Sequence, residues 1–541
     1  MRVKVISILL ACTLVGGLSA LAVALVAEET VPTTAPVALV KAAAPRTGAK
    51  AVAPPPDLSP PPPGSAPPEP PPPSAADLPT APPPVPSPPP QADTDPDLVA
   101  RLAALVSDSA VTAAGAVGVS VTDASGAVVF STRASEPLIP ASTQKLVVAA
   151  GALATLGPDY RYTTTVQATA PIGADGVLAG DLVMVGGGDP VLASPVFVAE
   201  VQPGRPHTPL VALADQLVAA GLRRVGGRLL GDPTAFADEP VPAGWLPRYL
   251  DELDGSRTSA LTVDAGRRLT IEDGRLLGYA AEDPAGQAAA ELAFLLTERG
   301  VGIDGGFGAS RTAPVTGPPL AAVQSPPLRD LLQYMVQRSD NPMADTIFRS
   351  VGASAGAPTW VGSAASVRDV LTPLGLDWSG TVLADGSGLS RDDRLSATFL
   401  TALDAGMSRS SLAGEWEPLM AVAGRSGTLR RRLLGTVAEG RVRGKTGTLP
   451  DVRSIAGAVL GPGTTRYHVA VVGNGLAGAG TDTIRGLQDA VILVLAEDLY
   501  GCVRVEVPQP APPAPPSPAP GQPPPPAPPA PDPVFELRCA A

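Results

Sequence analysis

Ser142 and Lys145 lie three residues apart at the beginning of the apolar run 146–150. Pro140 precedes them and Gly157-Pro158 follows, a pattern that predicts a buried helix with both side chains in its first turn. Positions i and i+3 share one face of a helix, so the amine can reach the hydroxyl. The positive end of the helix dipole disfavours an ammonium and favours a neutral amine that can accept the serine proton. The spacing therefore predicts a serine nucleophile with a lysine base.

Lysine is scarce in this chain, which strengthens that interpretation. Of only five lysines, Lys4, Lys41 and Lys50 precede any expected folded domain. Lys145 and Lys445 remain, and arginine supplies the other positive charge. Because arginine stays protonated in proteins, it cannot serve as the base. The alternative, a surface lysine that happens to follow a serine, is disfavoured.

A second polar segment, Ser339-Asp340-Asn341-Pro342, follows a helical run. In a loop that Pro342 makes rigid, Ser339 and Asn341 can point the same way into a cleft. There Ser339 could relay a proton between Lys145 and a leaving amine, and Asn341 could bind a substrate amide. The alternative is a polar helix cap, but Asn341 is one of only two asparagines in the chain.

The segment Lys445-Thr446-Gly447-Thr448 predicts a strand that enters the same site. Gly447 would let the backbone approach a substrate closely. Lys445 and the hydroxyls of Thr446 and Thr448 could bind a carboxylate.

Composition excludes several other classes of function. The net charge of −12 and the pI of about 4.8 argue against a nucleic-acid partner. His207 and His468 are the only histidines, too far apart in sequence to suggest zinc or a Ser-His-Asp triad, so we expect no metal and no cofactor. Cys502 and Cys539 flank a Pro-rich tail and would either pair in an oxidising compartment or stay as thiols.

The N-terminal segment, residues 1–30, predicts export to an extracytoplasmic, cell-wall or membrane-associated location. Arg2 and Lys4 precede an uncharged apolar run, Val5–Val26, and Glu28-Glu29 follow it, so the positive end stays in the cytoplasm. The run is long enough to span a bilayer, and it also offers a small-residue cleavage site. A cleaved signal peptide and a retained membrane anchor both remain open.

Two Pro-rich segments flank the globular region. Residues 31–96 are rich in Pro, Ala and Ser and predict an extended polyproline II linker. Residues 508–535 form a similar tail.

Between these segments, helix and strand patterns alternate in a way that indicates an α/β domain and not a helix bundle. A catalytic domain is expected at 97–162 and 315–500, with an inserted β-rich region at 163–314. The expected elements are helices that begin at Pro96 and at residues 140, 286, 328 and 481, and strands at 117–122, 127–131, 441–448, 454–460 and 466–473.

The three motifs occur in a fixed order, separated by 339 − 142 = 197 and 445 − 339 = 106 residues. With Gly-Gly-Gly-Asp-Pro at 186–190 and Asp-Gly-Ser-Gly-Leu-Ser at 385–390, they resemble the D-alanyl-D-alanine carboxypeptidase/endopeptidase family. These are low-molecular-mass class C penicillin-binding proteins, peptidase family S13. The resemblance covers about residues 97 to 499.

The resemblance implies a five-stranded antiparallel sheet between helical layers, with the β-rich domain inserted between the first two motifs. It implies that Ser142 attacks the D-Ala-D-Ala bond of peptidoglycan stem peptides, with Lys145 as base and an oxyanion hole from the N–H groups of Ser142 and Thr448. β-Lactam antibiotics would acylate the same serine.

The resemblance also implies that Ser339 passes the proton to the leaving D-alanine. Lys445, Thr446 and Thr448 would hold the D-alanine carboxylate. Arg391 would meet a carboxylate of the stem peptide, although a surface salt bridge explains an arginine there equally well.

Two other functions share the three motifs. A class A β-lactamase needs a Glu-x-x-x-Asn loop, and no asparagine lies between Asn341 and Lys445. A non-catalytic wall scaffold that binds β-lactams is the second alternative. The insertion is shorter than in the larger family members, so carboxypeptidase activity is expected more firmly than endopeptidase activity.

Overall fold

The computed structural model describes residues 90–92, 94–311, 318–507 and 534–539, all within one compact unit, Pro83–Ala541. The predicted export segment, nearly all of the predicted linker and most of the Pro-rich tail lie outside these residues. No helix in the described part is both long and apolar enough to cross a membrane.

The central element is a six-stranded sheet in which all neighbours run antiparallel. The predicted α/β class is confirmed. The sixth strand is the two-residue β15, which pairs with the edge of β16 and was not among the five strands that the family resemblance implied. In sheet order the strands are β15 (Ala421–Val422), β16 (Val442–Leu449), β17 (Val452–Leu460), β18 (Arg466–Asn474), β1 (Ala116–Asp123) and β2 (Val128–Thr132).

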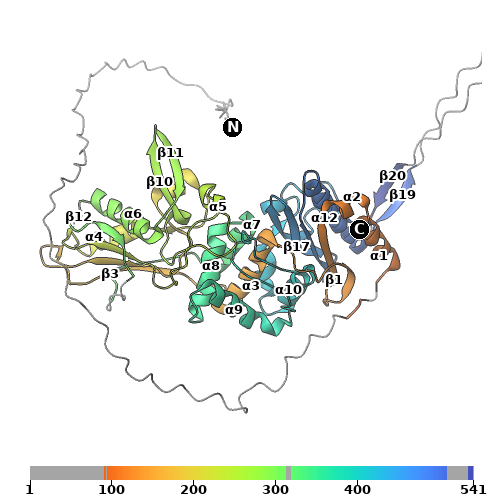
Figure 1. Ribbon diagram of the computed structural model, residues 1–541, viewed down its shortest axis with the longest axis horizontal. Helices are drawn as coiled ribbons and strands as arrows, with labels where there is room; N and C mark the ends of the chain where they lie inside the picture. Colours follow the sequence, from red (N-terminus) through yellow and green to blue (C-terminus); the bar gives the residue numbers. More distant parts are fainter. Residues whose placement is uncertain (1–89, 93, 312–317, 508–533, 540–541) are drawn as a thin grey trace, which may run out of the picture. The chain divides into compact units, whose positions relative to one another are not determined.

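Both faces of this sheet are covered by helices, because β17 and β18 carry small apolar residues on both sides. On β18, Val469 and Val471 join a core with helices α1 (Pro96–Val106), α2 (Ser109–Ala114) and α12 (Gly480–Leu499). The alternate residues Ala470 and Val472 join the core on the other face (Figure 1). That core contains helices α3 (Gln144–Leu156), α7 (Leu328–Arg338), α8 (Asn341–Ser354), α9 (Trp360–Leu371) and α10 (Ala397–Arg409).

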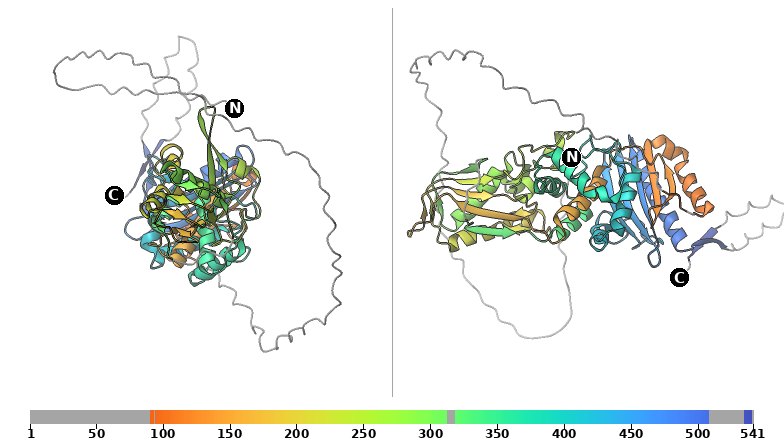
Figure 2. Two further views of the ribbon diagram at one scale, coloured as in Figure 1. Left: turned by 90° about the vertical axis from the view of Figure 1, so that its left-hand side faces the viewer. Right: turned by 90° about the horizontal axis from the view of Figure 1, so that it is seen from below.

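The inserted region forms its own sheet, distinct from the first (Figure 2). Its edge strand β14 pairs with β3, so this sheet extends beyond the expected boundary at residue 314. The sheet is mixed, and helices α4 (Val211–Ala219) and α6 (Pro284–Glu298) pack in its core. Its strands, in sheet order, are β13 (Phe307–Ala309), β9 (Leu229–Asp232), β5 (Leu182–Val185), β3 (Thr163–Ala168) and β14 (Ala321–Gln324).

Two shorter elements of the inserted region matter below. Helix α5 (Arg248–Asp251) and the hairpin of β10 (Arg267–Glu272) and β11 (Arg275–Ala280) lie between β9 and α6 in the chain.

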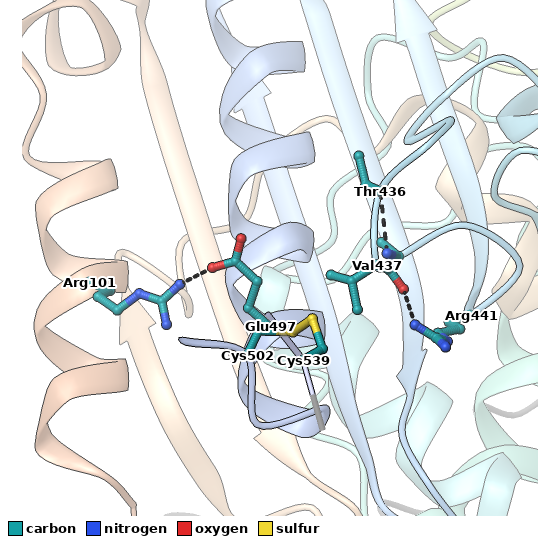
Figure 3. Close-up of a disulfide and its surroundings, with 8 residues drawn as sticks. Arg101, Thr436, Val437, Arg441, Glu497, Cys502 and Cys539 are labelled. Atoms are coloured by element: carbon teal, nitrogen blue, oxygen red, sulfur yellow. Dashed lines mark hydrogen bonds and ion pairs between the residues drawn. A yellow bond between two sulfur atoms is a disulfide. The ribbon is translucent and has the colours of Figure 1, made fainter. Parts of the chain in front are cut away.

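At the C-terminus, β19 (Val503–Val507) and β20 (Val534–Arg538) form an antiparallel hairpin. A disulfide between Cys502 and Cys539 closes it, which resolves the alternatives left open by the sequence (Figure 3). Beside it, Glu497 of α12 pairs with Arg101 of α1.

Candidate active site

Ser142 lies in a short 3-10 turn, Ala141–Thr143, that leads directly into α3. Ala141 has a φ of +47°, a conformation that costs a residue with a Cβ about 1–3 kcal/mol. Ser142 lines an open cleft. Lys145 is the second residue of α3, and its Nζ lies 3.0 Å from Ser142 Oγ.

Lys145 has three oxygen partners. Its Nζ lies 2.6 Å from Asn341 Oδ1 and 2.5 Å from the carbonyl oxygen of Ser387, both of which can only accept. The third partner, the hydroxyl of Ser142, can also donate. A neutral amine has two N–H groups for the two acceptors, and its lone pair is then left to accept the hydrogen of Ser142. The contacts therefore suit a lysine that takes the proton of this serine.

Burial lowers the pKa of Lys145 to about 8, because a buried ammonium loses its hydration. The nearby carboxyls of Asp345, Asp385, Asp340 and Asp393 act in the opposite direction. The sequence argument expected a lowered pKa but attributed it to the helix N-terminus, whereas the main physical cause is desolvation.

The carboxyl of Asp345 holds the loop that presents the Ser387 carbonyl to Lys145. Its Oδ1 accepts hydrogen bonds from the backbone N–H groups of Gly386 and Ser387, each at 2.9 Å. Burial, and then the charge of Asp385, raise the pKa of Asp345 well above the usual range.

The second motif joins two helices. Ser339 ends α7 in a left-handed conformation, with φ at +60°, and Asn341 begins α8. Pro342 was expected to end or redirect the preceding element, and it occupies the first turn of the new helix, where its missing N–H costs nothing. The left-handed residue redirects the chain, so Ser339 and Asn341 both line the cleft with Ser142.

Lys445 of β16 completes the site from the opposite wall. Its Nζ donates to Ser339 Oγ at 2.9 Å and to the carbonyl of Thr446 at 2.6 Å. Burial and the charge of Lys145 hold the pKa of Lys445 well below its usual range. The direct partner of Ser339 is thus Lys445, not Lys145, which the sequence analysis had placed in the proton relay.

Gly447 has a packing role beside the expected one, and the expectation that it lets the backbone approach a substrate stays a prediction. A Cβ there would lie 2.1 Å from Ser454 Oγ, 2.7 Å from the Pro140 carbonyl oxygen and 3.0 Å from Ala141 Cβ. The glycine therefore allows β16 to pack directly against the turn that carries the nucleophile. Ser454 Oγ itself donates to the Pro140 carbonyl at 2.6 Å.

Asn474, the second asparagine, also holds this turn. No pattern in the sequence predicts this role. Its Oδ1 accepts from the N–H of Ile139 at 2.7 Å, and its Nδ2 donates to the carbonyl of Ile139 at 3.0 Å. The two bonds fix β18 to the segment that leads into Ser142.

The cleft has a volume of about 460 Å³. Ser142, Ser339, Asn341, Thr446 and Thr448 line it, as the three motifs predicted. Residues that the sequence did not single out also line it: Arg248, Tyr249, Glu252 and Asp254 come from the inserted region, and Thr428, Leu449, Pro450 and Arg453 come from the catalytic domain.

Thr428 lies in the short 3-10 turn Gly427–Leu429. Its hydroxyl lies 2.8 Å from that of Thr446. A larger cavity of about 1060 Å³ lies away from the motifs, between α5, β11 and α6.

Arg391 does not line this cleft. Its guanidinium binds Asp451 through two bonds, Nη1 to Oδ1 at 2.9 Å and Nη2 to Oδ2 at 2.8 Å. This is the salt bridge that the sequence analysis named as the alternative, and a role toward a stem-peptide carboxylate stays a prediction. In the described residues, no group of three or more His, Cys, Asp or Glu side chains could hold a metal ion.

Comparison with known proteins agrees with the motif analysis. The model of the D-Ala-D-Ala carboxypeptidase 3 (S13) family matches residues 98–273 and 272–497. A D-alanyl-D-alanine carboxypeptidase of Actinomadura sp. (strain R39) is 31% identical over 467 residues, which cover 73% of this chain and 83% of that protein. Carboxypeptidase DacB of Mycolicibacterium smegmatis is 33% identical over 383 residues, or 68% of this chain and 78% of that protein.

Among solved structures, penicillin binding protein 4 (dacB) from Haemophilus influenzae has a similar fold. The TM-score is 0.63 at 22% identity, and the match covers 74% of this chain and 99% of that one.

Proposed function

The chain belongs to the D-Ala-D-Ala carboxypeptidase (S13) family, and from this we propose that Ser142 is the nucleophile that removes the terminal D-alanine of peptidoglycan stem peptides. The observation that carries the assignment is the contact of 3.0 Å between Lys145 Nζ and Ser142 Oγ in an open cleft. The other lysine of the described residues, Lys445, contacts a second serine of the cleft, Ser339, to which we assign the proton transfer described next.

Acylation begins when Ser142 Oγ attacks the carbonyl carbon between the two D-alanines and its proton passes to Lys145 Nζ. The C–N bond then breaks, and Ser339 Oγ gives a proton to the leaving amine. The contact of Ser339 with Lys445 supports this step, since the lysine can replace the proton. Lys145 gains one proton and Lys445 loses one, so the net charge of the two lysines is unchanged. Before deacylation, Lys145 gives its proton to water in the open cleft and Lys445 regains one through Ser339, which also lines the cleft.

Lys445 and the hydroxyls of Thr446 and Thr448 are proposed to bind the D-alanine carboxylate. Lys445 is buried, and in the described residues its amine contacts a hydroxyl and a carbonyl but no carboxylate. This supports the role, because an incoming anion would offset the cost of its charge. Thr428 holds the hydroxyl of Thr446 in place. The N–H groups of Ser142 and Thr448 are the proposed oxyanion donors, each worth about 3–4 kcal/mol in other enzymes.

Deacylation repeats the chemistry with water. Lys145 takes a proton from water, the hydroxide attacks the ester carbonyl, and Ser142 regains its proton as the shortened peptide leaves. A β-lactam would form the same ester with Ser142, but its leaving group stays tethered, so we propose that these drugs label the protein.

The decisive experiment compares the purified protein with its Ser142→Ala variant on a pentapeptide and on cross-linked muropeptides. We expect D-alanine release from the pentapeptide, and a penicillin mass adduct, only with the unchanged serine. Cleavage of cross-links would add endopeptidase activity. Penicillin labelling without release of D-alanine would contradict the carboxypeptidase assignment, and rapid turnover of a chromogenic cephalosporin would favour a β-lactamase.

We also propose that the protein works outside the cytoplasm, either released or anchored by its N-terminal apolar run. The charge pattern around that run supports export, and the disulfide between Cys502 and Cys539 suits an oxidising compartment. Fractionation of cells that produce the protein would test this, since recovery with reduced cysteines in the cytoplasm would contradict it.

A further inference from the structure

The inserted region reaches the second catalytic motif through Arg205, which lies between the helical turn at 197–201 and β7 (Thr208–Pro209). Its Nε lies 3.2 Å and its Nη2 3.1 Å from Asp340 Oδ2. The two side chains are only 2% and 9% exposed. Removal of one partner from a buried ion pair is strongly destabilising, because the other charge is left without compensation.

Asp340 is the middle residue of the second motif, and both of its oxygens are used. While Oδ2 pairs with Arg205, Oδ1 accepts from the N–H of Met343 at 3.0 Å and caps α8. The preceding residue, Ser339, has the left-handed conformation that disfavours side chains with a Cβ. These two contacts therefore help to hold the turn, together with the bonds from Lys445 to Ser339 and from the Asp340 N–H to the Met335 carbonyl.

Asn341, the next residue, is held by a second contact from the inserted region. Its Nδ2 donates to the carbonyl oxygen of Asp254 at 2.7 Å. Because the oxygen and nitrogen of an amide lie on opposite sides of the group, this bond turns Oδ1 toward Lys145 Nζ, 2.6 Å away. The amide can orient Lys145 only while Asp254 keeps it in this direction.

We propose that the inserted region positions the catalytic turn, with Arg205 as the main positioning residue. Arg205 does not line the cleft, so it acts through Asp340 and does not bind the substrate. The proposal rests on the proposed function and deepens it, since it explains why a carboxypeptidase of this kind would need its insertion for catalysis.

The pair also affects the protonation of Lys145, because the charge of Asp340 raises the pKa of this lysine. Without Arg205 that charge is balanced only by the more distant Arg267 of β10, with Tyr334 of α7 also near it, so the pKa of Lys145 should rise. The base is then neutral only at higher pH, and acylation should require a higher pH. The other ionisable groups that act on Lys145 remain unchanged in such a variant: Asp345 on α8, Asp385 and Asp393 on the loop after α9, and Lys445 on β16.

The test compares Arg205→Met with Arg299→Met in the full chain. Arg299 pairs with Asp215 in the same inserted region but contacts neither motif. The rate constant for acylation by a fluorescent penicillin is measured as a function of pH, together with the melting temperature. We expect Arg205→Met to lower the rate constant about tenfold or more, because a catalytic group misplaced by about 1 Å costs about a hundredfold. The pH midpoint of Arg205→Met should rise, while Arg299→Met should keep the rate constant and the pH midpoint of the unchanged protein.

An Arg205→Met protein that melts earlier, yet acylates at the original rate with the original midpoint, would show a purely structural role and overturn the proposal. If this variant does not fold, Arg205→Lys replaces it; the lysine keeps the charge but loses the planar fork, so we expect a slower rate with the original midpoint.

The double variant Arg205→Met, Asp340→Asn provides the sharper control. Asn still caps a helix but carries no charge. The pH midpoint of acylation should therefore fall to that of the unchanged protein or below it. A pH midpoint that stays raised in the double variant would refute the claim that the unpaired charge of Asp340 raises the pKa of Lys145. Penicillin acylation does not depend on the natural substrate, so absence of D-alanine release would reject the proposed function while these comparisons would still decide the role of Arg205.

Discussion

Replacement of Gly447 by alanine tests whether close packing of β16 against the nucleophile turn controls the reaction. The added Cβ would lie 2.7 Å from the carbonyl oxygen of Pro140, whereas ordinary contact begins at 3.4 Å. The strand and the turn must therefore separate by about 3.4 − 2.7 = 0.7 Å. The contact of 2.1 Å with Ser454 Oγ can be relieved by rotation of this side chain about its Cα–Cβ bond, but the backbone of Pro140 cannot move away so easily.

A displacement of this size is comparable with the tolerance of about 0.5 Å for a productive catalytic geometry. Gly447→Ala should lower the penicillin acylation rate constant about tenfold to a hundredfold. It should also cost about 1–3 kcal/mol of folding free energy, as overpacking usually does. Stopped-flow acylation and chemical denaturation measure the two effects separately.

The matched control is Gly486→Ala on α12, which is exposed and has no atom within 4 Å of the added Cβ. It should leave acylation unchanged and stabilise the helix by about 1 kcal/mol. Addition of Ser454→Ala to Gly447→Ala should restore only part of the rate, because the Pro140 contact remains. A Gly447→Ala protein that acylates at the original rate would refute the packing argument.

Three other predictions follow from individual contacts. Because the pKa of Lys145 is about 8 and the base must be neutral, the acylation rate constant should rise about tenfold per pH unit below that value and level off above it; a flat profile would contradict a lysine base. Trp245→Phe removes the donor to Asp385 Oδ2 at 2.7 Å, so acylation should slow about tenfold, and an unchanged rate in penicillin labelling would show that this bond does not position the loop. Joint replacement of Cys502 and Cys539 by serine opens a loop with a sequence separation of 37 and should lower stability by at most about 4 kcal/mol in calorimetry, with acylation unchanged because neither residue lines the cleft.

Much of the fold follows from local patterns. The hairpin of β1 and β2, the helices α1, α7 and α12, and the strands β17 and β18 appear close to their expected positions. Periodicity, turn residues and helix caps lie within a few residues of the element that they specify. The two-residue β15 has no such pattern, since it exists only because β16 offers a free edge.

The sequence by itself determined the chemistry of this protein: three motifs, a spacing of three residues that places Lys145 beside Ser142, and a chain with almost no other lysine. Only the tertiary structure decided how these groups are held. Arg205 and Asp340 are 135 residues apart, and Ile139 and Asn474 are 335 apart. Contacts at such separations depend on how whole layers of the fold pack, so no local sequence pattern predicts them. For the same reason the sequence indicated Arg391 as a candidate site residue but could not predict that its guanidinium pairs with Asp451.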